Sequence, residues 1–301
     1  MNIVLTGSSG YVGSCLAHRL IKEGHGVWGF DKNPPRPSLK GTANYHHTRV
    51  DLSDLTLLRQ ACIALPDIDI GIHAAASQAL QHPMELTEVV RDNCLGTANL
   101  LRVADEKSIL HWVMLSSSGV YGQPQPVPVS ENSPTRPHSA YGLSKLHAEE
   151  LFRFYCQHHG MHAVVLRCDR VYGIGQQVPG LVQYLIQTLE SYEDVELFSH
   201  GNIPYDPVYI DDVIGAVQLA IQHVARQTLD VFNIGGGAPA TSRELAETIK
   251  KRLKSSSNII VRSYDNPSYS PTAVMDISRA RSILGFSPGS LTANMDIMLK
   301  Q

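Results

Sequence analysis

The sequence has none of the features that place a protein in a membrane or on nucleic acid. No apolar run approaches the roughly 20 residues that cross a bilayer. No block of like charges forms a tail, and the formal net charge of −3 offers no electrostatic attraction to nucleic acid or to an anionic membrane surface. We therefore expect no nucleic-acid partner and no membrane partner.

Cysteine is scarce and never occurs in a C-x-x-C pair. The five cysteines are scattered along the chain, which argues against a disulfide framework or a zinc site and suits a reducing compartment. The first residues, MNIVLTGSSG, reach a glycine turn after three consecutive apolar residues and lack the basic start and long apolar core of a signal peptide. The expected location is the cytoplasm.

Histidine is the metal-binding residue type that the chain does contain, with fourteen copies. The pairs His46–His47 and His158–His159 are adjacent in sequence, where neighbouring side chains diverge. No H-E-x-x-H or similar ligand spacing occurs. We expect no metal site.

The remaining composition is that of an ordinary globular protein. Its 301 residues, 43% of them hydrophobic, suffice for one large domain or for two smaller domains that share a cleft. Apolar segments typical of buried strands (2–7, 26–31, 69–76, 111–118, 162–168) alternate with segments of helical period (11–24, 87–106, 141–160). This alternation predicts an α/β fold, a Rossmann-like doubly wound parallel sheet with helices on both faces.

A glycine-rich turn, TGSSGYVG, lies between the first expected strand and the first expected helix. Gly7 permits a tight turn, Gly10 lets the backbone approach a pyrophosphate, and Gly13 lets the helix pack close to the strand. The free N–H groups and the positive dipole at the start of that helix then face the phosphates. The turn predicts a dinucleotide site.

An acidic residue follows where such a site needs one. Asp31 ends the second expected strand, eighteen residues beyond Gly13, where its carboxylate can accept hydrogen bonds from the adenosine ribose. The same carboxylate would repel a 2′-phosphate, so NAD is favoured over NADP. Lys32 and Arg36 follow closely and weaken that preference.

The pattern loosens after Val171 into loops rich in proline and glycine. Segments 201–222 and 230–236 look like a return to the sheet, and the remainder, which ends in SRARSILGF, is expected to form a small cap. The predicted division is an NAD-binding Rossmann domain over residues 1–170, completed by about 206–236. A smaller, mostly C-terminal α+β substrate-binding domain takes residues 171–205 plus 237–301.

Two further segments carry candidate chemistry. SAYGLSK places Tyr141 four residues before Lys145, one turn apart on one helix face, a pair that ordinary helix surfaces also contain. LSSSGVYG (115–122) runs from a strand into a loop, and ligands bind beyond the carboxyl ends of parallel strands. Its serines therefore lie where a substrate would meet the cofactor, although serines at a strand end also form turns.

With these segments the chain resembles the extended short-chain dehydrogenase/reductase family, the NAD-dependent epimerase/dehydratase group that includes nucleotide-sugar epimerases. The resemblance covers nearly the whole length. It rests on TGSSGYVG (6–13), VDLSD (50–54), IHAAA (72–76), NCLGT (93–97), SSSGVYG (116–122), SAYGLSK (139–145), LRCDRVYG (166–173), VYIDDV (208–213), FNIGGG (232–237) and SRARSILGFSP (278–288).

The resemblance implies roles for individual residues. Tyr141 becomes the general acid/base and Lys145 its activator, whose charge is expected to lower the phenol pKa from its free value of about 10. Ser117, three residues before the valine of VYG, becomes the serine that orients the substrate oxygen while a hydride passes to or from the nicotinamide. Lys145 is also expected to hydrogen-bond the nicotinamide ribose.

Further positions follow from the same resemblance. The cofactor-binding set is implied to be Gly7, Ser9, Gly10, Tyr11, Val12, Gly13, Asp31, Lys32, Asp51, Leu52, Ala74, Ala75, Ala76, Asn93, Tyr141, Lys145 and Val171. The substrate-binding set is implied to be Ser77, Ser117, Ser118, Gly119, Arg170 and Tyr205.

The chain departs from the family pattern at several positions. Ser118–Gly119 stands where family dehydratases carry Asp–Glu, so a 4,6-dehydratase is not expected. Tyr205 and Asn266 stand where nucleotide-sugar epimerases usually have arginines that grip the diphosphate, and Arg170 stands where asparagine is familiar. Arg170 either replaces a lost phosphate contact or pairs with a carboxylate such as Asp169 or Asp206.

Three functions are compatible with these observations. The first is an NAD-dependent oxidoreductase of the sugar epimerase type acting on a sugar or nucleotide sugar. The second, motivated by the missing arginines, is a dehydrogenase or reductase of a small hydroxy or keto compound. The third is a non-catalytic NAD-sensing module, against which the presence of Tyr141, Lys145 and Ser117 argues.

The family commonly forms homodimers through the helix that carries the Tyr–Lys pair. That helix offers Leu146, Leu151, Phe152 and Tyr155 for such a seam, and a buried core face accounts for these residues equally well.

Overall fold

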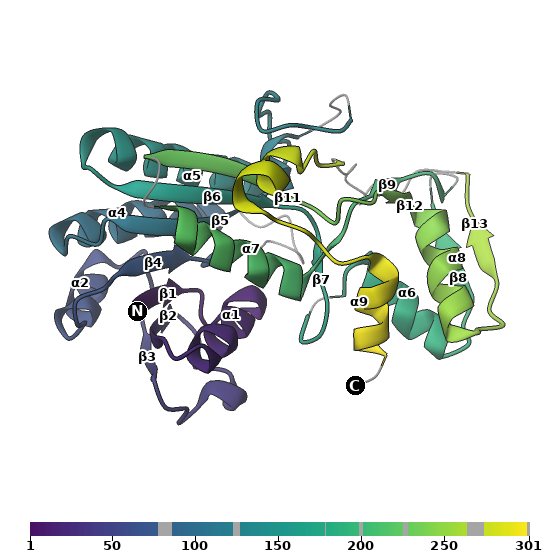
Figure 1. The fold of residues 1–301 in the computed structure, drawn as a ribbon, viewed down its shortest axis with the longest axis horizontal. Helices are drawn as coiled ribbons and strands as arrows, with labels where there is room; N and C mark the ends of the chain where they lie inside the picture. Colours follow the sequence, from purple (N-terminus) through teal and green to yellow (C-terminus); the bar gives the residue numbers. More distant parts are fainter. Residues whose placement is uncertain are drawn as a thin grey trace.

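The computed structural model describes residues 1–77, 86–122, 127–177, 179–198, 201–224, 228–263 and 274–299. Its centre is a seven-stranded sheet with the strand order β11-β6-β5-β4-β1-β2-β3 (Figure 1), in which every neighbouring pair is parallel. The strands are β1 (Asn2–Thr6), β2 (Gly26–Asp31), β3 (Tyr45–Arg49), β4 (Ile70–His73), β5 (His111–Ser117), β6 (His162–Cys168) and β11 (Leu229–Ile234).

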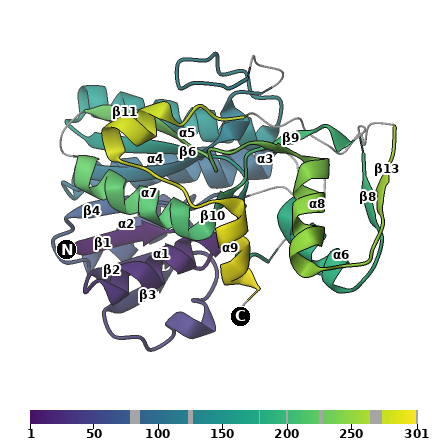
Figure 2. The same cartoon turned by 45° about the vertical axis from the view of Figure 1, so that its right-hand side comes forward.

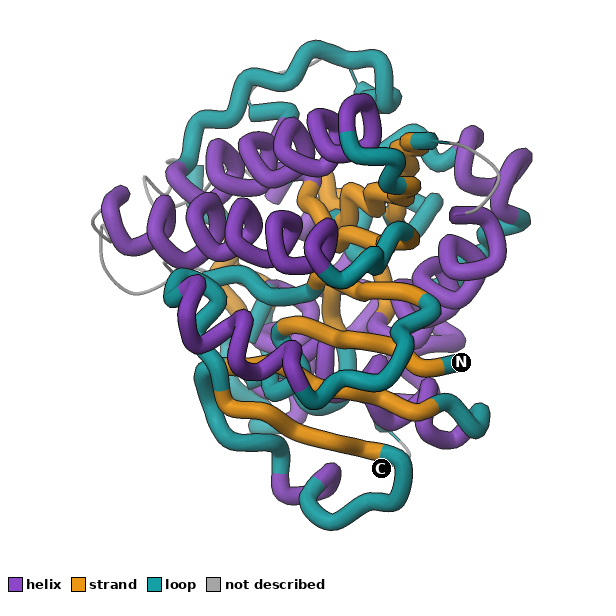
Figure 3. Tube along the Cα trace, turned by 90° about the vertical axis from the view of Figure 1, so that its left-hand side faces the viewer, coloured by secondary structure: helices purple, strands orange, loops and turns teal. Residues whose placement is uncertain are grey.

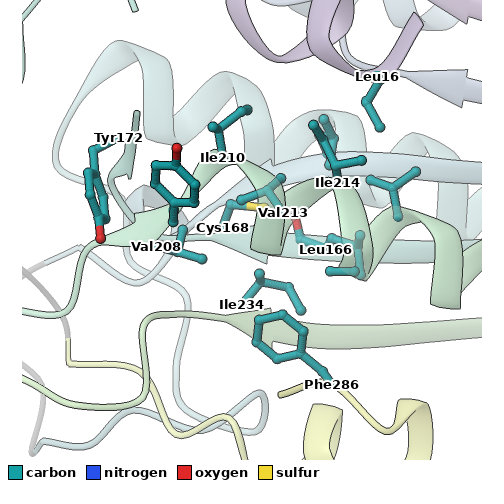
Figure 4. Packing of buried hydrophobic residues seen from close by; sticks show 14 of the residues in the cluster. Leu16, Leu166, Cys168, Tyr172, Val208, Ile210, Val213, Ile214, Ile234 and Phe286 are labelled. Atoms are coloured by element: carbon teal, nitrogen blue, oxygen red, sulfur yellow. Dashed lines mark hydrogen bonds between the residues drawn. The ribbon is translucent and has the colours of Figure 1, made fainter. Parts of the chain in front are cut away.

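Helices cover both faces of the sheet (Figure 3). On one face lie α1 (Tyr11–Lys22) and α7 (Ile210–His223), and their buried side chains join one core cluster with strand residues such as Leu166 and Ile234 (Figure 4). On the other face, α2 (Leu55–Ile63), α4 (Gly96–Glu106) and α5 (Ala140–His158) bury a second cluster around Trp112 and Phe152. The predicted Rossmann-like doubly wound fold is confirmed.

Two of the helices that cover the sheet start where a side chain accepts their first N–H groups. The Asp54 carboxylate accepts the N–H groups of Thr56 and Leu57 at 3.0 Å, which begins α2. Ser139 Oγ accepts the Gly142 N–H at 3.0 Å, which begins α5. The expected helix over 87–106 is interrupted, since α3 (Leu86–Val89) passes through a π-turn at Val90–Leu95 before α4.

A smaller group of elements lies beyond the carboxyl end of the sheet, on the right in Figures 1 and 2. The helices α6 (Leu181–Glu190) and α8 (Ser242–Leu253) pack on each other, and β8 (Val195–Leu197) pairs with β13 (Ile259–Val261). Short ladders join β7 (Val171–Tyr172) to β10 (Val208–Tyr209), and β9 (Pro204–Tyr205) to β12 (Ala240–Thr241). Helix α9 (Leu291–Met298) follows the last loop.

The return to the sheet differs in part from the prediction. Of segment 201–222, β9 and β10 pair outside the main sheet, and only α7 packs on it. Segment 230–236 contributes β11, which pairs with β6 as expected. The segment SRARSILGF was expected in the cap, but its turn Ala280–Leu284 packs against β11 and α7. The division into two domains at the proposed boundaries stays a prediction.

The residues expected at a dimer seam on α5 contact the core of the chain itself. Phe152 is fully buried in the second core cluster, and Leu151 and Tyr155 pack against the same cluster. Leu146 packs against the cluster on the opposite face. A core face therefore accounts for Phe152, whereas a seam that includes the partly buried Leu146, Leu151 and Tyr155 stays a prediction.

All five cysteines are free. Among the described residues, no group of three or more His, Cys, Asp or Glu side chains is placed to hold a metal ion. Within the same part of the chain, no helix has both the length and the apolar character that crossing a membrane requires.

Candidate active site

The glycine turn between β1 and α1 is packed too tightly for side chains at two positions. Gly7 has φ +72°, and a Cβ there would lie 2.6 Å from the Ala75 backbone nitrogen. A Cβ at Gly13 would lie 2.0 Å from the Gly7 carbonyl oxygen. The first turn of α1 therefore sits directly against the end of β1, as the spacing of the glycines predicts.

The start of α1 is suited to an anion. Gly10 is its N-cap, and within the described residues no side chain caps the helix or places an acidic group in its first turn. The first N–H groups of α1 are thus left for a ligand, and the helix dipole favours negative charge there. These residues fit the pyrophosphate of a dinucleotide.

Asp31 is tied to this turn by its carboxylate. Oδ2 accepts the Ser9 N–H at 3.0 Å, and Oδ1 accepts the Asn33 N–H at 2.8 Å. Arg36 Nε donates to the Ser9 carbonyl at 3.0 Å, while its buried Nη2 has no hydrogen-bond partner among the described residues. Lys32 pairs instead with Asp92 at 2.6 Å.

The other positions implied for the cofactor lie around the same edge of the sheet. Ala74 and Ala75 follow β4, where their N–H groups donate to Thr6, and Asp51 and Leu52 follow β3. The Asn93 amide exchanges hydrogen bonds with the backbone of Ser77 and donates to Ser144 at 2.9 Å. Further implied positions are Ala76, on the loop after β4, Val12 and Tyr11 in the first turn of α1, and Val171 in β7.

The serine loop and the turn that carries Tyr141 are in backbone contact. A Cβ at Gly142 would lie 2.4 Å from the Gly119 carbonyl oxygen. Gly119 belongs to the short helix Ser118–Val120 directly after Ser117, and Gly142 follows Tyr141 in α5. The packing brings the two predicted catalytic segments together at the carboxyl end of β5.

Lys145 is enclosed by the protein one turn after Tyr141. It is 2% exposed, and burial lowers its pKa to about 8, while the carboxylate of Glu149 acts in the opposite direction. Its charge reaches His73 at the end of β4, where burial and Lys145 together lower the imidazole pKa to about 3. His73 is held between Thr6 Oγ1 at 2.7 Å and Thr97 Oγ1 at 2.9 Å.

A buried ion pair, which the sequence did not reveal, supports this part of α5. Arg167 in β6 donates to the Glu149 carboxylate, with Nη2 2.7 Å from Oε2, and both side chains are at most 5% exposed. Tyr121 accepts from Arg167 at 2.9 Å and donates to Asn233 at 2.6 Å. Glu149 therefore has fixed partners on the sheet beneath Lys145.

The three consecutive serines have different partners. Ser116 donates to Glu149 at 2.5 Å and is buried. Ser118 donates to Asp169 Oδ1 at 2.8 Å. Ser117 Oγ accepts the Gly119 N–H at 3.1 Å, so its own hydroxyl hydrogen can serve a ligand. This difference favours Ser117 as the serine that meets the substrate.

The unusual residues of the predicted substrate region are neighbours. The Arg170 guanidinium lies over the Tyr205 ring. Burial raises the pKa of Asp169, and the charge of Arg170 opposes part of that increase. Burial and the charge of Asp169 raise the pKa of Asp206 to about 6. Both roles considered for Arg170 stay open, and Asn266 lies outside the described residues.

Comparisons with known proteins agree with this geometry. The family model of the NAD dependent epimerase/dehydratase family matches residues 3–235. The putative UDP-glucose 4-epimerase of Methanocaldococcus jannaschii is 30% identical over 293 residues, which are 95% of this chain and 93% of that protein.

Solved structures share the whole fold. The UDP-glucose 4-epimerase of Thermotoga maritima, crystallised with UDP-glucose, superposes with a TM-score of 0.86 at 25% identity. The superposition covers 100% of this chain and 98% of that protein. MoeE5, crystallised with UDP-glucose and NAD, gives a TM-score of 0.85 at 28% identity with the same coverage.

Proposed function

The chain belongs to the NAD-dependent epimerase/dehydratase family, and from this membership we propose that it is an NAD-dependent oxidoreductase of the sugar epimerase type acting on a nucleotide sugar. The observation that carries the proposal is the contact between Gly119 and Gly142. It joins the loop of Ser117 to the turn of Tyr141 beside the buried ammonium of Lys145. A structural helix face would not need that arrangement at the ligand-binding edge of a parallel sheet.

Each of the three side chains has a distinct task. Tyr141 takes the proton of the sugar hydroxyl at the reacting carbon and later returns a proton to the same oxygen. Lys145 stabilises the phenolate by its charge, which is retained at neutral pH because its pKa lies near 8. Ser117 donates its hydroxyl hydrogen to the substrate oxygen and fixes its position.

NAD is the cofactor that the turn at Gly7–Gly13 and the Asp31 carboxylate support, and when bound it supplies reversible hydride transfer. The pyrophosphate would lie on the first N–H groups of α1. The ribose hydroxyls would lie beside Asp31, whose carboxylate disfavours the 2′-phosphate of NADP.

The test is turnover of UDP-glucose by purified protein, followed by product analysis and by NADH absorbance. We expect epimerised product without net NADH, and a loss of at least about 10³-fold in Tyr141→Phe with NAD binding retained. Tyr184→Phe on the exposed side of α6 is the matched control and should keep full activity. Unchanged turnover in Tyr141→Phe would overturn the catalytic assignment.

A second candidate is a dehydrogenase of a small hydroxy compound. It is favoured by Tyr205, an uncharged residue where a diphosphate-binding arginine was expected, and by the two buried carboxyl groups near Arg170. Stoichiometric NADH from small polyols, together with no binding of UDP, GDP or dTDP sugars, would select this function.

A homodimer is a further part of the proposal. The outer face of α5 exposes Leu143 and Phe154, and Leu95 is exposed at the end of the π-turn Val90–Leu95, which contacts α5. These side chains would extend a seam that includes the partly buried Leu146, Leu151 and Tyr155. The mass in solution, measured for the wild type and for Phe154→Glu, tests whether this face forms the dimer.

The cytoplasmic location also stays a prediction.

A further inference from the structure

We propose that Asp169 is a substrate-binding residue, which accepts a hydrogen bond from a sugar hydroxyl next to the reacting carbon. The proposal rests on the nucleotide-sugar function above and adds a residue that determines which sugar is accepted.

Asp169 is held at the active-site edge of the sheet from two sides. It follows β6 directly, and its N–H donates to the Ile234 carbonyl at the end of β11 at 2.9 Å. Its Oδ1 accepts from Ser118 at 2.8 Å, and Ser118 is the neighbour of Ser117. One carboxyl oxygen is therefore fixed against the serine loop that meets the substrate.

The second oxygen of the same carboxyl group has no such contact. Asp169 is 5% exposed, and Oδ2 has no hydrogen-bond partner among the described residues. A buried carboxyl oxygen without a donor is unfavourable, and native proteins rarely retain one without a use. A ligand hydroxyl would satisfy it, since a hydroxyl donates one hydrogen bond and fits a single acceptor.

The charges around Asp169 favour a neutral donor. Arg170 lies next to it and partly balances its charge, while Asp206 places a second carboxyl group nearby. The Ser118 hydroxyl and the Arg170 backbone N–H also act on the Asp169 carboxylate as hydrogen-bond donors. An anionic group on the sugar would meet two carboxyl groups, whereas a hydroxyl meets an acceptor that is already oriented.

Asp206 provides an internal comparison. Its Oδ2 is also buried and unpartnered among the described residues, but a Cβ at Gly235 would lie 2.6 Å from that oxygen. Its Oδ1 accepts the Ala238 N–H at 3.2 Å. Asp206 thus lies against the glycine segment after β11, and its hydrogen bonds in the described structure go to backbone N–H groups rather than to the serine loop. Comparing Asp169→Asn with Asp206→Asn therefore distinguishes a loss of substrate binding from a general effect of removing a buried carboxylate.

The experiment compares kcat/KM for UDP-glucose and its 2-deoxy, 3-deoxy and 6-deoxy analogues. We expect the wild type to lose roughly 10- to 100-fold with one analogue, as removal of a hydrogen bond to a charged group implies. Asp169→Asn should lose a similar factor with UDP-glucose and discriminate among the analogues by less than about 3-fold. Asp206→Asn should keep the wild-type discrimination.

Equal use of all analogues by the wild type, or full discrimination in Asp169→Asn, would overturn the proposal. Calorimetric binding of UDP-glucose and the analogues to NAD-loaded Tyr141→Phe separates it from the proposed function. One outcome is that Tyr141→Phe binds the sugars selectively, that Tyr141→Phe/Asp169→Asn loses this selectivity, and that the wild type shows no turnover. That outcome would retain the role of Asp169 and reject the epimerase function. Turnover of UDP-glucose without a contribution from Asp169 would retain the epimerase function and reject the role of Asp169. Failure to bind any of these sugars would reject both proposals.

Discussion

The guanidinium of Arg170 lies over the ring of Tyr205, with its central carbon 4.9 Å from the ring centroid. Strand β9 brings Tyr205 to this point, and the Arg170 carbonyl accepts the Val208 N–H at 3.0 Å directly after it. The ring keeps the cation flat and in place, a contact worth about 0.5–2 kcal/mol.

This stack leads to a prediction about UDP binding. If Arg170 contacts the diphosphate, Arg170→Ala should weaken UDP binding by at least about tenfold, because a charge-assisted hydrogen bond is lost. Tyr205→Phe keeps the ring and should change UDP affinity little. Tyr205→Leu removes the ring beneath the guanidinium and should weaken UDP binding. Calorimetry at low and high salt measures the effect. Unchanged UDP affinity in Arg170→Ala would show that the guanidinium serves the carboxyl groups alone.

The pH dependence of catalysis should report on Lys145. Its pKa of about 8 predicts that kcat/KM declines above pH 8, where the ammonium loses its proton. The Glu149 carboxylate favours the charged form, so Glu149→Gln should lower this pKa and move the declining limb to lower pH by roughly one unit. The exposed Glu150→Gln, whose carboxylate pairs with Arg153, is the control and should leave the limb in place. A limb that does not move in Glu149→Gln would assign it to another group.

Two glycine-to-alanine substitutions should have opposite effects. Gly13→Ala places a methyl group 2.0 Å from the Gly7 carbonyl and should destabilise the fold by about 1–3 kcal/mol or more, with loss of NAD binding. Gly215 lies in α7, and apart from its chain neighbours and the backbone of its own helix no described atom lies within 4 Å of its Cβ position. Gly215→Ala should stabilise the protein by about 0.5–1 kcal/mol, because alanine is the better helix residue. Denaturant unfolding measures both, and equal values would contradict the tight turn.

Stability should fall as Asp206 ionises. Burial raises its pKa from the usual 3.8 to about 6, so between these values the folded chain holds a proton that the unfolded chain has released. The free energy of unfolding should therefore decrease by about 2 kcal/mol as pH rises from 4 to 6, and by about 3 kcal/mol in total once both the folded and the unfolded chain have released the proton. Asp206→Asn should flatten this dependence and be the more stable form at pH 8. Parallel pH profiles for the two proteins would refute the assignment.

The sequence predicts most of the main sheet because its strands are apolar and regularly spaced. The bounds of β2 and β6 agree with the expected segments, whereas β4 is shorter, since Ala74–Ala76 already leave the sheet beside the glycine turn. The strand β3 was not predicted, because YHHTR at the edge of the sheet carries no alternating apolar pattern. The short helix α2 was also overlooked.

The sequence predicts the residues of the site only where the functional side chains are close together along the chain. The four-residue spacing of Tyr141 and Lys145 defines a helix face in any context. In contrast, Ser118 and Asp169 are 51 residues apart, and Glu149 and Arg167 are joined across two elements. Such pairs exist only after β5, β6 and α5 have packed, so sequence spacing alone cannot indicate them.

The pairing of β11 with β6 also bears on how the chain is made. A ribosome delivers β6 some sixty residues before Leu229 emerges, and until then one flank of a strand rich in valine and leucine has no neighbour. Unpaired flanks of this kind recruit strands from other molecules. Truncation before residue 229 is therefore expected to yield inclusion bodies rather than a working half-protein, and chaperone demand during synthesis should end only when that last strand is in place.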